Sequence, residues 1–145
     1  MVLFGEKYSN MNKILVGIDG SKGSQLALDK AMMLISEEGE IILIAVVPTP
    51  IEKTFVDINV YKKMKIKANQ ILKNIIKEIG NKKIKICRII EEGDAAEKII
   101  DTAATLNVDL ITLGSRGSSK IGAYPIGSTA NKVVQYSHKP VMLVR

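Results

Sequence analysis

Short apolar runs alternate along this chain with segments in which apolar residues recur every three or four positions. The runs are rich in β-branched residues and are bounded by polar or turn-forming residues, a pattern typical of strands. Most are apolar on both faces, as expected for a sheet covered by helices on both sides. We therefore expect strands at residues 13–18, 41–47, 84–90, 108–113 and 141–145.

The intervening segments have the periodicity of amphipathic helices. They predict helices at residues 22–37, 57–80, 94–106 and 128–137, with Asp94 as an N-cap. Strands that alternate with helices indicate an α/β fold with a parallel sheet. Right-handed crossovers leave few arrangements of five such strands, chiefly the order 3-2-1-4-5 and a flavodoxin-like variant. We predict a five-stranded parallel sheet of order 3-2-1-4-5 with helices on both faces.

This strand order predicts the position of a binding site. The chain changes direction between the first and fourth strands, and ligands of such sheets bind outside the carboxyl ends of the strands at that point. The first apolar run ends at Asp19 and the fourth at Gly114. Gly114 also opens a stretch rich in glycine and serine that lasts until Gly127. Two independent arguments thus point to the same place.

The glycine-rich stretch has the chemistry of a phosphate site, although turn formation alone would explain one or two of its glycines. Gly127 and Ser128 lie where the last helix begins, and free N–H groups and the helix dipole attract anions there. Glycines also let the backbone approach a phosphate closely. Ser128 or Thr129 is expected to cap this helix. The residues expected around the phosphates are Gly114, Ser115, Arg116, Gly117, Gly127 and Ser128.

Two common nucleotide signatures are missing from the sequence. The segment "GSRGSSK" has the wrong spacing for the G-x-x-x-x-G-K-[ST] loop of many ATPases. The segment "GIDGSKGS" departs from the G-x-G-x-x-G fingerprint of dinucleotide-binding enzymes. Neither a P-loop ATPase nor a Rossmann dehydrogenase is favoured.

Composition narrows the choice of partner and compartment. The net charge of +6 suggests nucleic acid, but the lysines concentrate on the solvated face of the helix at 57–80 and aromatic residues make up only 4%. We therefore expect no nucleic-acid partner. No apolar stretch reaches the roughly 18 residues of a membrane span, so no membrane association is expected. A single cysteine, Cys87, excludes an internal disulfide and favours the cytoplasm.

Three segments carry a family resemblance. They are "NKILVGIDGSKGSQLAL", "GSRGSSKIGAYPIGS" with its G-x2-G-x9-G-[ST] spacing, and "HKPVMLVR". Together they resemble the universal stress protein family, and the glycine motif resembles that of its ATP-binding branch. The resemblance covers residues 12–145 and leaves residues 1–11 as an N-terminal extension. It implies a fold like that of the adenine nucleotide α-hydrolases, which is Rossmann-like.

The resemblance also implies roles for individual residues. Asp19 would accept hydrogen bonds from the ribose hydroxyls of ATP or contact a Mg or Mn ion on its phosphates, with no metal site made by protein alone. Gly17 and Ile18 would lie beside the adenosine, and the backbone of Val46 would meet the adenine edge. Leu113 and Thr129 would flank the nucleotide. The implied assembly is a homodimer through the strand at residues 141–145, acting as a nucleotide-dependent switch in the stress response.

Two other functions remain open from the residues alone. The chain can be a slow ATPase, although no general base is evident and the only histidine, His138, is expected at the far end of the last helix. It can also be a dimerisation module of the same fold that binds no nucleotide. A response-regulator receiver is rejected, since the first strand ends in a single acid, Asp19, where that class needs a pair.

Overall fold

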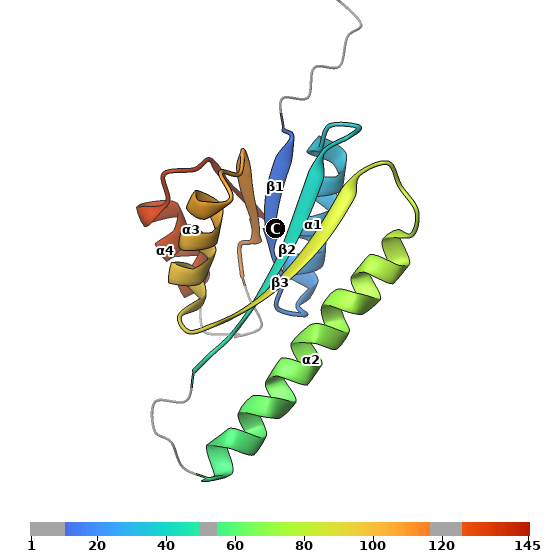
Figure 1. The fold of residues 1–145 in the computed structure, drawn as a ribbon. Coiled ribbons are helices and arrows are strands. Elements are labelled where there is room, and N and C mark those ends of the chain that lie inside the picture. Colours follow the sequence, from blue (N-terminus) through green and yellow to red (C-terminus); the bar gives the residue numbers. More distant parts are fainter. Residues whose placement is uncertain (1–10, 50–54, 117–125) are drawn as a thin grey trace, which may run out of the picture.

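The computed structural model describes residues 11–49, 55–116 and 126–145. One parallel sheet forms the centre of the molecule, with the strand order β3-β2-β1-β4-β5. The predicted fold and strand order are therefore confirmed (Figure 1). The strands are β1 (Lys13–Gly17), β2 (Glu40–Val47), β3 (Lys85–Glu92), β4 (Leu110–Gly114) and β5 (Val141–Val144).

The helices cover both faces of the sheet. One pair lies on one side and the other pair on the opposite side, as Figure 1 shows. The first pair is α1 (Lys22–Leu34) and α2 (Phe55–Ile79), and the second is α3 (Ala95–Thr105) and α4 (Ser128–Tyr136). Each helix follows a strand, so every helix begins at the edge of the sheet where the strands end. None of the described helices is both long and apolar enough to cross a bilayer.

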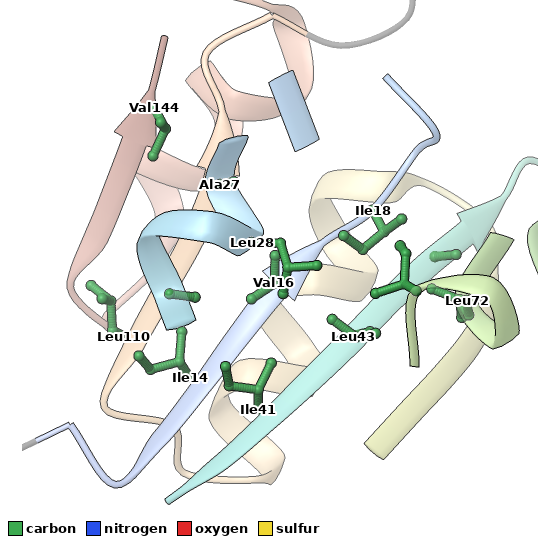
Figure 2. Close-up of a cluster of buried hydrophobic side chains, with 13 residues drawn as sticks. Ile14, Val16, Ile18, Ala27, Leu28, Ile41, Leu43, Leu72, Leu110 and Val144 are labelled. Atoms are coloured by element: carbon green, nitrogen blue, oxygen red, sulfur yellow. The ribbon is translucent and has the colours of Figure 1, made fainter. Parts of the chain in front are cut away.

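The two layers of core side chains follow from the alternation of β1. Ile14 and Val16 point into the cluster under α1 and α2, whereas Leu15 belongs to the cluster under α3 and α4. All three side chains are fully buried, because β1 lies between β2 and β4 at the centre of the sheet. Figure 2 shows the first cluster, in which Leu28 of α1 and Leu72 of α2 meet the strand side chains.

Two helices differ from the sequence expectation. Helix α1 ends at Leu34 rather than at residue 37, because the N–H of Ser36 leaves the helix to donate to the carbonyl of Met11. Among the side chains of helix α2 that the structure describes, those from Ala68 onward pack against the core. The helical periodicity of residues 57–80 predicts Met64 on the same apolar face as Ala68 and Leu72. In the structure Met64 is 40% exposed, since α2 extends beyond the sheet at its beginning (Figure 1).

Candidate functional site

A cleft opens at the carboxyl ends of β1, β2 and β4, where the strand order reverses. It has an apolar wall made by the strand ends and α3, and a polar wall made by the beginnings of α1 and α4 together with Arg116. We call these the strand wall and the helix wall. The lining residues are Gly17, Ile18, Asp19, Ser21, Ser24, Ile44, Val46, Ala95, Ile99, Leu113, Gly114, Arg116, Gly127, Ser128, Thr129 and Ala130.

The strand wall is built from core side chains. Ile18, Ile44 and Leu113 line the cleft and are at most 5% exposed. Leu113 reaches across to β1, where a Cβ atom on Gly17 would lie 2.4 Å from its Cδ2 atom. Gly17 therefore leaves the space that Leu113 fills. The result is an apolar wall, which suits the face of a planar ring.

The helix wall has an open helix N-terminus. The N-cap of α4 is Gly127, which has no side chain to accept from the first turn, so the predicted cap by Ser128 or Thr129 is wrong. By contrast, Ser21 caps α1 by accepting from the N–H of Ser24, and Asp94 caps α3 as predicted. The first N–H groups of a helix lack intrahelical partners. Residues 127–130 line the cleft, and among the described residues no side chain caps the first N–H groups of α4.

The backbone N–H and carbonyl groups of Ser115, which follows β4, connect this strand to β5 and α4 behind the helix wall. Its carbonyl accepts from the N–H of Gly127 at 2.6 Å, and its own N–H donates to the carbonyl of Val144 at 2.8 Å. The residue is buried, and its side chain is not among those that line the cleft. The structure therefore assigns Ser115 a backbone connection between β5 and α4, and does not bring its hydroxyl to the predicted phosphate site.

A backbone contact holds the beginning of α1 against the end of β4. A Cβ atom on Gly114 would lie 2.6 Å from the carbonyl carbon of Gly23. A Cβ atom on Gly23 would lie 2.7 Å from the carbonyl oxygen of Arg116. Both positions thus require glycine for space. Close packing against Gly23 is therefore enough to explain why residue 114 is a glycine, whether or not a phosphate binds nearby.

Two charged residues, Asp19 and Arg116, lie among the described lining residues. Asp19 accepts a hydrogen bond from the N–H of Ser21 at 2.9 Å, which orients its carboxylate at the end of β1. Both charged residues are exposed at the mouth of the cleft. A carboxylate and a guanidinium on one rim can bind a ligand that carries hydroxyls at one end and negative charge at the other, the carboxylate accepting from the hydroxyls and the guanidinium donating to the charged group.

The beginning of α3 borders the cleft through Ala95. The preceding residue, Asp94, accepts from the N–H of Glu97 at 3.0 Å. That hydrogen bond lowers the pKa of Asp94 below its usual value, helped by Lys132 of α4, whose Nζ atom lies 3.4 Å from the carboxylate, while partial burial opposes the shift. This pair links the two helices on the same side of the sheet.

The cleft gathers most of the residues that the sequence predicted for a site. Ser115 is the exception described above, and Gly117 lies outside the described residues. Sequence reasoning missed six lining residues, although periodicity signals some of them. Ile44 lies two positions before Val46 on the same strand, and Ile99 lies four positions after Ala95 on the same helix. The missed residues are Ser21, Ser24, Ile44, Ala95, Ile99 and Ala130.

A sequence model of the universal stress protein family matches residues 10–145. The chain belongs to this family. The universal stress protein YxiE of Bacillus subtilis is 34% identical to it, over 92% of this chain and 99% of that protein. Family membership and fold thus agree with the resemblance seen in the glycine motif.

Solved structures support the same assignment. The structure of MJ0577, from Methanocaldococcus jannaschii, is similar with a TM-score of 0.86 and 29% identity, over 92% of this chain and 95% of that one. A family protein from Arabidopsis thaliana, solved with AMP bound, matches with a TM-score of 0.63 over 92% of this chain and 90% of that one. At 19% identity this second likeness shows the shared fold alone.

Proposed function

We propose that this universal stress protein binds ATP, with Mg or Mn on the phosphates, in the cleft between the strand wall and the helix wall. The observation that carries the proposal is the N-terminus of α4, which has no side-chain cap and borders the same cleft as the apolar strand wall. A nucleotide has this division, with a planar base at one end and phosphates at the other. The AMP bound to the Arabidopsis family protein is a further reason to expect an adenine nucleotide.

The two walls divide the nucleotide between them. The adenosine lies against Ile18 and Leu113, and the backbone of Val46 meets the adenine edge. The Asp19 carboxylate accepts from the ribose hydroxyls or contacts the metal ion. The phosphates meet Arg116 and the N–H groups at the beginning of α4, where the helix dipole favours negative charge. Hydrogen bonds to a charged group contribute roughly 1.5–3 kcal/mol each, so three or four suffice for micromolar affinity.

The charged groups of the cleft favour binding and regulation over catalysis. Asp19 and Arg116 are the charged residues among its described lining. His138 lies between α4 and β5, at the end of the molecule away from the carboxyl ends of the strands. We therefore propose a nucleotide-dependent regulator of the stress response in the cytoplasm, with at most slow hydrolysis of ATP.

The test is a calorimetric titration with Mg-ATP of protein that has been checked for nucleotide retained during purification. Gly127→Val is the variant, because a branched side chain at the N-cap projects toward the N–H groups that would receive the phosphates. Asn131→Val is the matched control. It adds the same side chain to an exposed position of the same helix, and residue 131 does not line the cleft.

We expect micromolar binding by the wild-type chain and by Asn131→Val, and none by Gly127→Val. Circular dichroism must show that all three proteins are folded. If nucleotide-free wild-type protein does not bind Mg-ATP, the proposal is wrong, and the chain is better described as a dimerisation module of the same fold.

We also propose a homodimer through residues 141–145. β5 pairs with β4 on one side and has no strand neighbour on the other among the described residues. Its sequence, Val-Met-Leu-Val, carries neither proline nor charge, the features that usually protect an edge strand. Light scattering at micromolar concentration is expected to give the mass of two chains. A monomer mass at that concentration would rule out this assembly.

A further inference from the structure

Gly23 occupies an unusual position for a glycine. It lies in the first turn of α1, two residues after the N-cap Ser21, and its φ is not in the left-handed region. Glycine within a helix is less favourable than alanine by up to about 1 kcal/mol, because it loses more backbone freedom on folding. The backbone conformation at this position therefore does not require glycine, and another constraint must explain it.

That constraint is space beside the helix wall. A Cβ atom on Gly23 would lie 2.7 Å from the carbonyl oxygen of Arg116 and 3.5 Å from the Cα atom of Gly114. The nearer atom belongs to the backbone, so rotation of a side chain cannot relieve the contact. On the other side, Gly114 is the last residue of β4 and pairs in register with Val144 of β5. Arg116 is exposed and lies two residues beyond the end of β4, so we expect its carbonyl group, rather than the strand, to give way.

We propose that Gly23 is a positioning residue for the phosphate end of the nucleotide. This inference rests on the proposed ATP binding. It names a residue that does not line the cleft but controls how the cleft binds the phosphates. Because position 23 carries no side chain, the Arg116 peptide lies against the first turn of α1 and its guanidinium is held at the rim of the cleft. A side chain at position 23 displaces that peptide and with it the cationic part of the helix wall. The apolar side chains of the strand wall are not among the three atoms nearest to such a Cβ atom, so we expect that wall to keep its shape.

The variant Gly23→Ala tests this directly, with Gly39→Ala as the matched control. A Cβ atom on Gly39 would also meet close neighbours, at 2.6 Å from Cγ1 of Ile35 and 3.1 Å from the carbonyl oxygen of Asn12, but Gly39 lies at the amino end of β2, away from the cleft. We expect Gly23→Ala to weaken Mg-ATP binding by about tenfold or more, the equivalent of one hydrogen bond to a charged group. Adenosine, which lacks phosphates, should keep its affinity within about twofold. Gly39→Ala should bind both ligands as the wild-type chain does.

A second measurement needs no ligand. In two-dimensional ¹H–¹⁵N spectra of the nucleotide-free protein, Gly23→Ala should shift the amide resonances of Ser115 and Arg116 and leave those of Ile44 and Val46 in place. Unchanged resonances at 115 and 116 would overturn the inference, whether or not the wild-type protein binds ATP. Failure of the wild-type protein to bind ATP would instead refute the proposed function.

The remaining outcomes are equally decisive. If wild-type protein binds ATP and Gly23→Ala binds it with the same affinity, the proposed function stands and the positioning role is wrong. If Gly23→Ala loses affinity for ATP and for adenosine equally, the inference is also overturned, because such a result indicates general damage to the cleft. A Gly23→Ala protein that does not fold would show that the core, rather than the Arg116 peptide, takes up the contact, and this too contradicts it.

Discussion

The two walls of the cleft are made by different kinds of groups, the strand wall by buried side chains and the helix wall by backbone N–H groups and an exposed arginine. The strand wall consists of side chains that also fill the core, such as Leu113, which is 4% exposed. The helix wall consists largely of backbone N–H groups at the beginning of α4 and of Arg116, whose side chain is exposed. Changes to the strand wall must therefore alter stability and binding together. Changes to the helix wall can alter binding while the fold remains as stable as before.

Leu113→Ala should give the largest effect, because it removes a buried side chain from both the core and the cleft. We expect the free energy of unfolding to fall by about 2–5 kcal/mol. Affinity for ATP and for adenosine should fall together, since both place the base on this wall. Urea denaturation followed by fluorescence or circular dichroism measures the first effect, and calorimetry the second. Loss of ATP affinity alone would contradict the division into two walls.

Gly127→Asp should separate binding from stability at the helix wall. An aspartate at the N-cap accepts from the first turn of α4 and places a negative charge at the positive end of its dipole. We expect the free energy of unfolding to rise by a few tenths of a kcal/mol. ATP affinity should fall by more than about tenfold, because the carboxylate occupies the N–H groups and repels phosphate. The same variant measured with adenosine, which should be little affected, is the control.

Asp94→Ala removes the cap of α3, the helix whose beginning borders the strand wall. The expected loss is about 1 kcal/mol of unfolding free energy at neutral pH. Because the folded chain holds the pKa of Asp94 below its usual value, this stabilisation exists above the unfolded pKa and is lost as the pH falls through the folded pKa. The difference between wild type and Asp94→Ala should therefore shrink below about pH 4. A difference that stays constant from pH 7 to pH 3 would show that the carboxylate is not the stabilising group.

Thr112→Val should give the smallest effect and leave both walls intact. Thr112 is fully buried in β4 on the face away from Leu113, and its hydroxyl has no hydrogen-bond partner within the described chain. A buried hydroxyl without a partner is unfavourable, so valine should raise the unfolding free energy by up to about 1 kcal/mol. ATP affinity should not change. Thermal denaturation detects the gain, and a lower melting temperature would indicate that the hydroxyl does have a partner.

The sequence predicted the fold well because the apolar runs and helical periods are local signals. The order of elements and the place of the cleft follow from them and from the handedness of crossovers. Errors arose where a contact between distant residues decides the local structure. Helix α1 ends early because Ser36 donates to Met11, and α2 is exposed at Met64 because the sheet does not reach that far.

The site was predicted less evenly than the fold. The glycine motif led to the beginning of α4, but it could not show that Ser115 is buried behind the cleft and does not line it. Nor could it show why Gly114 is a glycine, since the reason is a backbone contact with Gly23, far away in the sequence. Part of the apolar lining was missed, because isoleucines such as Ile44 and Ile99 look like ordinary core residues. Their second role depends on where the core happens to be open.

The two backbone hydrogen bonds of Ser115 would couple dimer assembly to ligand affinity. One of its groups is bonded to the N-cap of α4 and the other to Val144 near the end of β5. A ligand that displaced the N-cap would therefore act on the edge strand through Ser115, and a second chain paired with the edge strand would act on the N-cap. Thermodynamic linkage makes these two effects equal in free energy. By whatever factor pairing at β5 changes the affinity for a ligand at α4, that ligand changes the affinity of the two chains for each other.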